Sequence, residues 1–291
     1  MASPRDIRRR IKSVTGTVQI TRAMEMVAAS KMRRAQQASL ITRPFGHLLY
    51  RIQRQATTHA RDFTHPLLEA RQVRKRAVLL VGTDKGLCGA LNSNLFRLAD
   101  AFDPETTVFM AVGRQAAQFI ARTGRHLVAE FTMSDSPRFA EARPIAAAAR
   151  DLFVKGEVDQ VQVVATRFIN TLSQEPVVLE FLPVGEIKGL KLPGTDTDAE
   201  LGAGGPREFL FEPNAEAVLT YLLGHYLNVY IFRVMLEATA SEQSARMVAM
   251  KNATDSATRL ISDLTLSYNH LRQGNITTEL LDIAGGQLGD G

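Results

Sequence analysis

The sequence predicts an α/β protein in which long helices at the two ends of the chain pair as an antiparallel two-helix coiled coil, with a Rossmann-like α/β lobe inserted between them. Two observations lead to this fold class. Near both ends, apolar residues recur with a mean spacing of about 3.5 residues, which is the period of a coiled coil. Between the ends, short β-branched apolar segments alternate with segments of helical pattern, which is typical of a mostly parallel sheet.

We expect three parts along the chain. An N-terminal coiled-coil helix and its continuation occupy residues 1–76, the α/β lobe occupies residues 77–210, and a C-terminal coiled-coil helix occupies residues 211–291. With 291 residues, of which 45% are hydrophobic, the chain can bury a sizeable core, and disorder of the whole chain is excluded as an interpretation.

The first helix is expected from Pro4 to about Arg43. Ser3 is a favourable N-cap, and Asp6 places a negative charge in the first turn, where the helix dipole favours it. Pro44 should stop or kink this helix, and a second helical stretch should follow from Phe45 to about Phe63. The apolar stripe of the first helix consists of Ile7, Ile11, Val14, Val18, Thr21, Met24, Ala28, Met32 and Ala35.

The last helix carries a longer stripe of the same kind. Glu212 to Asn214 mark its start, and Gly285 with Gly286 marks its end. From Val218 to Leu271 it would extend about 80 Å, well beyond the roughly 30 Å of a small domain. The stripe consists of Val218, Leu222, His225, Val229, Phe232, Leu236, Thr239, Gln243, Met247, Met250, Thr254, Ala257, Ile261, Leu264, Tyr268 and Leu271.

Neither terminal helix can bury its stripe alone, so we expect the two to pair antiparallel. The C-terminal helix is the longer of the two. One end of it would therefore lack a partner within the chain and would need another protein around it.

The central part of the sequence alternates between strand and helix patterns, which predicts a small, largely parallel sheet with right-handed crossovers. A segment rich in Gly, Pro and Asp, residues 188–206, should be a surface loop that leads back to the last helix. The expected strands are residues 77–82, 106–112, 158–166 and 176–184, and the expected helices are residues 92–102, 114–122 and 143–154.

Positive charge is concentrated at the start of the chain. Residues 1–76 contain 17 Lys or Arg against 4 Asp or Glu, although the whole chain has a net charge of only +5. Such a segment is expected to face an acidic partner, which could be nucleic acid, anionic lipid or a protein ring lined with carboxylates.

The sequence lacks an apolar run of about 18 residues and the apolar stretch of a secretory signal. Its arginine-rich start also resembles a mitochondrial presequence, but Asp6 and the direct continuation into a long helix favour a structural N-terminus. A single cysteine, Cys88, excludes an internal disulfide and favours a reducing cytoplasm.

The loop from Gly82 to Ala90 follows the first expected strand, where nucleotide-binding folds place a phosphate loop. It matches neither G-x-G-x-x-G nor G-x-x-x-x-G-K-[ST], so a tight structural turn is the favoured interpretation. Cys88 has no evident base beside it in the sequence, and the histidines lack metal-ligand spacing. We therefore predict no catalytic residue, no bound cofactor and no metal site.

Several sequence blocks resemble the gamma subunit of the F-type, or rotary, ATP synthase. They are Ile20 to Met32 (ITRAMEMVAASKM), Asp84 to Asn94 (DKGLCGALNSN), Ala240 to Gln243 (ASEQ), Arg246 to Asp255 (RMVAMKNATD) and Ile276 to Leu280 (ITTEL). Their order and spacing agree with that family from end to end, so the resemblance covers the whole chain.

This resemblance implies a central rotor stalk that couples proton flow through a membrane ring to conformational change at catalytic sites on other subunits, during ATP synthesis or hydrolysis. The chain itself would not be an enzyme. Its implied partners are the alpha and beta subunits of the catalytic hexamer, the epsilon subunit and the ring of c subunits. Its implied location is the cytoplasmic side of the bacterial plasma membrane, as a peripheral protein.

The resemblance also implies a set of partner contacts. Arg22 and Met24 would lie near the acidic levers of the catalytic subunits. The polar contacts between the upper shaft and the surrounding ring would come from Arg246, Arg272, Gln273, Thr277 and Glu279.

Two other classes of function stay open at the level of sequence. A nucleotide-binding enzyme on the α/β lobe would bind or hydrolyse ATP and lose this activity when Lys85 is replaced. A DNA-binding coiled-coil protein would use its basic first helix and show binding that weakens steeply with salt. Aromatic residues do not alternate with the arginines, and the chain has no Trp, so a protein partner is favoured and nucleic acid is not expected.

Overall fold

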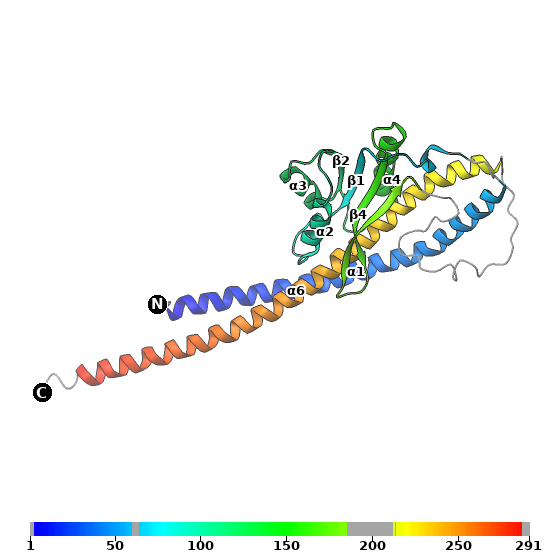
Figure 1. The fold of residues 1–291 in the computed structure, drawn as a ribbon. Helices are drawn as coiled ribbons and strands as arrows, with labels where there is room; N and C mark the ends of the chain where they lie inside the picture. Colours follow the sequence, from blue (N-terminus) through cyan, green and yellow to red (C-terminus); the bar gives the residue numbers. More distant parts are fainter. Residues whose placement is uncertain (1–2, 60–63, 185–211, 213, 287–291) are drawn as a thin grey trace. The chain divides into compact units, whose positions relative to one another are not determined.

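The computed structural model describes residues 3–59, 64–184, 212 and 214–286, and within these it leaves out the side chains of residues 42–59, 279 and 281–286. It divides into two compact units. The first, which we name the coiled-coil unit, comprises Met1–Ala28 and Arg246–Gly291. The second, the lobe unit, is Ala29–Ala245. Both long helices cross from one unit to the other (Figure 1).

Helix α1 extends from Pro4 to His59, and the cap predicted for it is present. The backbone N–H of Asp6 donates to Ser3 Oγ at 3.3 Å, and the backbone N–H of Ser3 donates to Asp6 Oδ2 at 3.1 Å. These reciprocal bonds satisfy donors that the first turn leaves without a helical partner.

Of the two outcomes expected at Pro44, a stop or a kink, the stop was wrong, because α1 continues through this residue to His59. A proline inside a helix removes one hydrogen bond and costs about 3 kcal/mol. In a helix of 56 residues the other backbone hydrogen bonds remain. The end expected near Phe63 lies outside the described residues.

Helix α6 extends from Ala215 to Gly286, as its sequence signals predicted. Asn214 is its N-cap, because its side-chain oxygen accepts from the backbone N–H of Ala217 at 2.8 Å. The Gly-rich loop expected before it, residues 188–206, lies outside the described residues.

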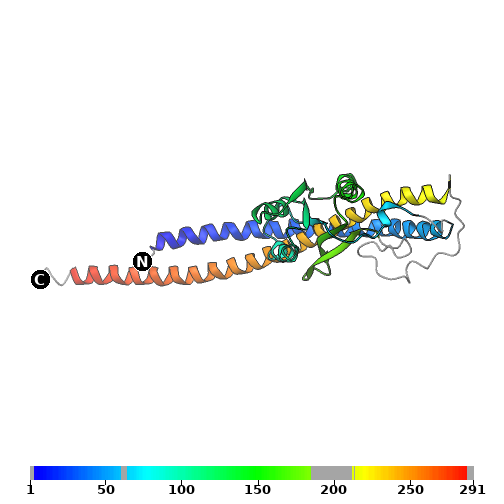
Figure 2. The same cartoon turned by 45° about the horizontal axis from the view of Figure 1, so that its top comes forward.

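In the coiled-coil unit, α1 and α6 lie side by side and run antiparallel in both views (Figures 1 and 2). Thr21 and Thr254 hydrogen-bond to each other through their hydroxyl groups at 2.7 Å. The non-exposed side chains follow the predicted stripes, which confirms the coiled-coil pattern. They include Ile7, Ile11, Val14, Val18, Thr21, Met24 and Ala28 on α1, and Met247, Met250, Thr254, Ala257, Ile261, Leu264, Tyr268 and Leu271 on α6.

The lobe unit contains a five-stranded sheet in the order β3-β2-β1-β4-β5, in which β1 to β4 are parallel and β5 is antiparallel to β4. The four predicted strands are present with ends shifted by a few residues. β3 was not predicted, because it is a five-residue edge strand of alternating half-buried and exposed residues and lacks a continuous apolar run. The strands are β1 Arg76–Val81, β2 Thr107–Val112, β3 Leu127–Phe131, β4 Gln160–Phe168 and β5 Gln174–Leu182.

The three helices predicted between the strands are also present: α2 Leu91–Asp100, α3 Arg114–Arg122 and α4 Phe139–Val154. Helix α4 begins four residues earlier than expected and contains Pro144 near its N-terminal end. A short 3-10 helix, η1, spans Pro66–Leu68.

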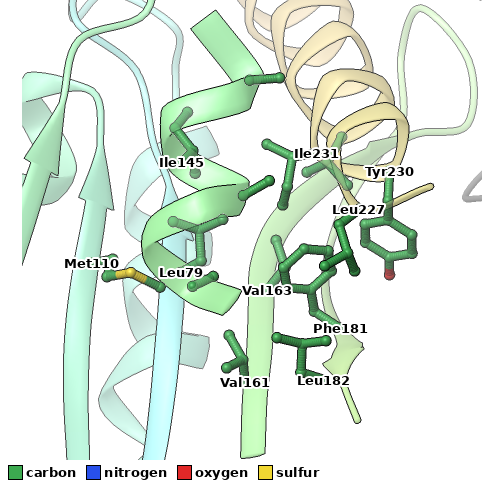
Figure 3. Close-up of a cluster of buried hydrophobic side chains, with 14 of the residues drawn as sticks. Leu79, Met110, Ile145, Val161, Val163, Phe181, Leu182, Leu227, Tyr230 and Ile231 are labelled. Carbon is green, nitrogen blue, oxygen red and sulfur yellow. The ribbon is translucent and has the colours of Figure 1, made fainter. Parts of the chain in front are cut away.

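Helices cover both faces of the sheet. One face packs against α2 and α3 through Val78, Phe109, Leu95 and Ile120. The other face packs against α4 and the first part of α6 through residues such as Leu79, Met110, Ile145, Leu227 and Ile231 (Figure 3). Full burial of each such side chain is worth about 1.5–3 kcal/mol. The first part of α6 therefore belongs to the core of the lobe unit.

Candidate functional site

The carboxyl edge of the sheet is where an open α/β fold would bind a ligand. The strand order reverses beside β1, since β2 and β3 lie on one side of it and β4 and β5 on the other. Ligands in such folds bind outside the carboxyl ends of the strands at this reversal. The nucleotide-binding hypothesis therefore depends on what occupies this edge.

Two glycines, at the carboxyl ends of β1 and β2, are explained by packing. A Cβ atom added at Gly82 would lie 3.0 Å from Ala116 Cβ on α3. At Gly113, which has φ +90°, an added Cβ would lie 2.8 Å from the carbonyl oxygen of Gly82. The ends of β1 and β2 thus approach each other more closely than a side chain at Gly113 would permit, and the end of β1 lies in tight contact with α3.

The polar groups of the same loop bond within the lobe. Thr83 Oγ1 donates to the carbonyl oxygen of Lys85 at 2.9 Å and accepts from Asn92 Nδ2 at 2.8 Å. Asp84 Oδ1 accepts from the backbone N–H of Arg114 at 2.9 Å, at the N-terminus of α3. A carboxylate therefore occupies a helix N-terminus that could otherwise attract a phosphate. This geometry supports the structural-turn interpretation.

The ammonium group of Lys85 is also engaged at this edge. Its Nζ lies 3.1 Å from Asp135 Oδ1, and Asp135 lies in the loop between β3 and α4. The same carboxylate accepts from Lys31 Nζ on α1 at 2.7 Å. Hydrogen bonds from these two lysines hold the pKa of the Asp135 carboxyl below its usual value.

Side chains of α6 bond to the other half of this edge. Ser241 Oγ donates to the carbonyl oxygen of Thr166 at 3.2 Å, near the end of β4. Ser244 Oγ donates to the carbonyl oxygen of Thr171 at 2.8 Å, in the hairpin between β4 and β5. α6 thus binds backbone groups at the edge that a nucleotide would use.

Glu237 belongs to the same face of α6 as these serines, since the three residues are four and three positions apart. Its Oε1 accepts from the backbone N–H of Phe168 at 3.2 Å. Burial raises the pKa of the Glu237 carboxyl above its usual value, although the hydrogen bond from Phe168 and the nearby Arg167 and Arg233 oppose this shift.

These α6 contacts were missed by the sequence analysis, which assigned a single stripe to the last helix. In fact every residue of α6 from Leu222 to Ala245 is buried or half-buried. A signal was available in the run from Ala240 to Ser244, where polar residues interrupt an otherwise apolar helix. Polar residues inside a buried helix usually have hydrogen-bond partners.

The described residues were also considered as possible metal ligands and as possible membrane-spanning helices. Within the described ranges, no group of three or more His, Cys, Asp or Glu side chains is arranged to hold a metal ion. The described helices include none that is long and apolar enough to span a bilayer.

The partner residues implied by the resemblance lie at separate places. Arg22 is exposed on α1, and Met24 is half-buried on the stripe. Arg246 on α6 is 7% exposed, so its side chain is largely buried. Ile20, Met26 and Val27 are exposed apolar residues next to Arg22 and Met24.

The remaining implied contacts lie near the end of α6. Arg272, Gln273 and Thr277 are exposed, and Thr277 Oγ1 donates to the carbonyl oxygen of Gln273 at 2.9 Å. The side chain of Glu279 lies outside the described part of the structure. Because Arg22 follows the residue that pairs with Thr254, it lies opposite residue 253 and about 28 Å along the helix axis from Arg272. The implied residues therefore form two separate patches and a buried arginine.

Among the described residues of the coiled-coil unit, the end of α6 has no helical partner. Counting along both antiparallel helices from the bond between Thr21 and Thr254 places Pro4, the first residue of α1, opposite Leu271. Beyond this point the side chains of residues 272–278 and 280 are exposed on every face of the helix, and they include Ile276 and Leu280. Exposed apolar residues on an unpaired helix end are typical of a surface that binds another protein.

Comparisons with known proteins agree along the whole chain. A family model described as ATP synthase matches residues 3–288. The ATP synthase gamma chain of Opitutus terrae is 45% identical over 294 residues, which cover 99% of each chain. The ATP synthase gamma chains of Desulforamulus reducens and Methylacidiphilum infernorum are 42% and 38% identical, and the alignments cover 98% and 100% of both chains in each pair.

Solved structures share the fold. A chain in the OSCP/F1/c-ring structure of the Euglena gracilis mitochondrial ATP synthase matches with a TM-score of 0.64 and 19% identity, over 98% of this chain and 94% of that chain. A chain in the central stalk and c-ring structure of the Tetrahymena thermophila mitochondrial ATP synthase matches with a TM-score of 0.60 and 24% identity, over 80% of this chain and 99% of that chain.

Proposed function

This chain belongs to the ATP synthase gamma chain family, and from this premise we propose that it is the central rotor stalk of an ATP synthase. Proton flow through a membrane ring would turn the stalk, and the stalk would force conformational change at catalytic sites on other subunits. The chain would be a non-catalytic subunit. The contacts at the carboxyl edge of the sheet support this view over a nucleotide-binding enzyme, because helix side chains and lysine–carboxylate pairs engage that edge.

The observation that carries the proposal is the unpaired end of α6. A helix whose side chains from 272 to 278 are all exposed, Ile276 among them, gains little from its own chain. A surrounding ring of subunits would cover it. We propose that Arg272, Gln273, Thr277 and Glu279 make polar contacts with the alpha and beta subunits there. Polar contacts suit a shaft that must pass several orientations without a deep hydrophobic trap.

The exposed face of α1 supports a second contact. Arg22 is exposed beside Ile20 and Met26, which combines a positive charge with apolar area. We propose that this patch, with Met24, meets acidic segments of the catalytic subunits. Arg246 is largely buried, so its proposed contact with the ring requires its side chain to move outward.

The remaining assignments complete the proposal. The epsilon subunit and the c-subunit ring would be the other partners, and the protein would be peripheral to the cytoplasmic side of the bacterial plasma membrane. The division into residues 1–76, 77–210 and 211–291 stays a prediction. No cofactor and no nucleic acid partner are proposed.

Co-purification tests the proposal. A tagged full-length chain should bring down larger ATP-binding subunits in clear excess over itself, whereas a variant lacking residues 273–291 should recover less of them. The isolated chain should neither hydrolyse ATP nor bind duplex DNA. ATP hydrolysis by the isolated chain that disappears with Lys85→Ala would instead favour an enzyme on the lobe, and recovery of the chain alone would refute the stalk.

A further inference from the structure

Asp135 joins three segments of the lobe unit. Its carboxylate bonds to Lys31 of α1 at 2.7 Å and to Lys85 of the loop after β1 at 3.1 and 3.2 Å. We name these three residues the Asp135 bridge. All three side chains are at least partly exposed, with Lys31 the least exposed at 29%. The bridge therefore links a long helix to the carboxyl edge of the sheet through two partly exposed ion pairs.

The two long helices are attached to the lobe in different ways. α6 contributes Leu223, Leu227, Ile231 and other residues to the apolar core shared with the sheet and α4. It also bonds to the backbone of β4 and the hairpin through its polar side chains. By contrast, neither core cluster of the described residues contains a residue of α1. Core packing with the sheet thus involves α6, whereas the buried apolar residues of α1 in the lobe unit, Met32 and Ala35, belong to neither cluster.

We propose that Asp135 is a positioning residue that holds α1 on the lobe through Lys31, so that a torque applied to the lobe reaches both long helices and not α6 alone. The torque part of this inference rests on the proposed function as a rotor stalk. The positioning part concerns the chain by itself and can be tested without any partner.

The physical character of the bridge defines how it should behave. Exposed ion pairs are individually weak and are screened by salt over about 8–10 Å at 0.10–0.15 M. A carboxylate that lies between two cations contributes more to stability than a carboxylate in a single ion pair. Removal of the Asp135 carboxylate takes this partner from both lysines at once. Its loss should therefore increase local opening of α1 by about fivefold and leave the core of the lobe intact.

The first experiment measures amide hydrogen exchange of the isolated full-length chain at low ionic strength. In Asp135→Asn, exchange in α1 residues 29–41 should accelerate by about fivefold. Asp135→Glu keeps the carboxylate and should restore most of the protection. Asp151→Asn is the matched control, since it removes a comparably exposed ion pair, with Arg150, that lies within α4 and joins no two elements. This control should leave the exchange of α1 unchanged.

The second experiment uses the complete ATP synthase in vesicles. Asp135→Asn should assemble and hydrolyse ATP, but ATP-driven proton uptake should fall relative to hydrolysis, and Asp135→Glu should restore the ratio. Unchanged exchange of residues 29–41 in Asp135→Asn would overturn the positioning role. Faster exchange with an unchanged uptake ratio would overturn the torque role. Failure of the wild-type chain to assemble with a ring would refute the proposed function and leave the exchange result standing.

Discussion

Deleting residues 273–291 should leave the lobe unit as stable as it is in the intact chain. The deleted segment belongs to the coiled-coil unit, and its described side chains are exposed, with Ile276 at 47% and Leu280 at 62%. Complete burial of such a side chain is worth about 1.5–3 kcal/mol, so the partial burial of these two is worth about 1.4–2.7 kcal/mol together. This contribution concerns the end of α6, so the free energy of unfolding of the lobe unit should change by less than about 0.5 kcal/mol.

A single core substitution should have a much larger effect. Ile231 is 0% exposed and packs in the core between the sheet, α4 and α6. Ile231→Ala should lower the free energy of unfolding of the lobe unit by about 2–5 kcal/mol, since it leaves a cavity as well as removing buried apolar area. With a urea slope of about 2–3 kcal/mol per molar, the midpoint should fall by about 1–2 M.

Tyrosine fluorescence distinguishes the two units during urea unfolding. The chain has no Trp and 5 Tyr, and Tyr226 and Tyr230 lie buried in the lobe core. Their signal should report the lobe, whereas far-ultraviolet circular dichroism should report mainly the long helices. If the deletion lowers the tyrosine-detected midpoint as much as Ile231→Ala does, then the end of α6 supports the lobe, and the division of stability between the two units is refuted.

Three other predictions concern single contacts. In a double-mutant cycle of Thr21→Val and Thr254→Val, urea unfolding should give a coupling energy of about 0.5–1 kcal/mol, because either single substitution already breaks the hydroxyl bond of 2.7 Å and the second cannot break it again. Additive effects would show that this bond does not join the helices. Gly113→Ala should lower the free energy of unfolding by about 3 kcal/mol or more, because Gly113 has a φ of +90° and an added Cβ would lie 2.8 Å from a carbonyl oxygen. Gly124→Ala should lower it by only about 1 kcal/mol, because Gly124 has a φ of +64° but open space around it. Equal shifts of the melting temperature in the two variants would contradict the steric argument. Because burial raises the folded-state pKa of Glu237 above the unfolded value near 4.5, its contribution to stability is lost as the pH rises through the raised pKa. The Glu237→Gln variant keeps an acceptor for the hydrogen bond from the backbone N–H of Phe168 in β4. The free energy of unfolding of this variant, relative to that of the unmodified chain, should therefore increase with pH above about 4.5. A difference between the two free energies that does not change with pH would refute this assignment.

The features that sequence predicted well are those with local physical causes. The cap formed by Ser3 and Asp6 depends on residues three positions apart, and Asn214 caps α6 in the same local way. The stripes from Ile7 to Ala28 and from Met247 to Leu271 follow from helical periodicity. The parallel strands β1 and β2 are almost wholly apolar, and β4 carries the buried run Val163 to Ala165, because helices cover both faces of the sheet.

The features that sequence missed depend on how distant segments pack. β3 is short and half-exposed, so it becomes recognisable as a strand only when β2 pairs with it. Pro44 fails to end α1, because one lost hydrogen bond does not outweigh the rest of the helix. Asp135 has no motif around it, and its importance arises only from the two lysines that the fold brings to it.

The amino-acid sequence by itself determined that two long helices with coiled-coil stripes flank an α/β sheet, because periodicity, caps and apolar runs are properties of neighbouring residues. Only the tertiary structure decided that α6 has a second buried face in the core of the lobe, and that its serines and glutamate bind the edge where such sheets hold ligands. The physical reason is that a helix can bury more than one face. Which partner covers each face depends on contacts between residues far apart in the chain, and these leave no periodic signal of their own.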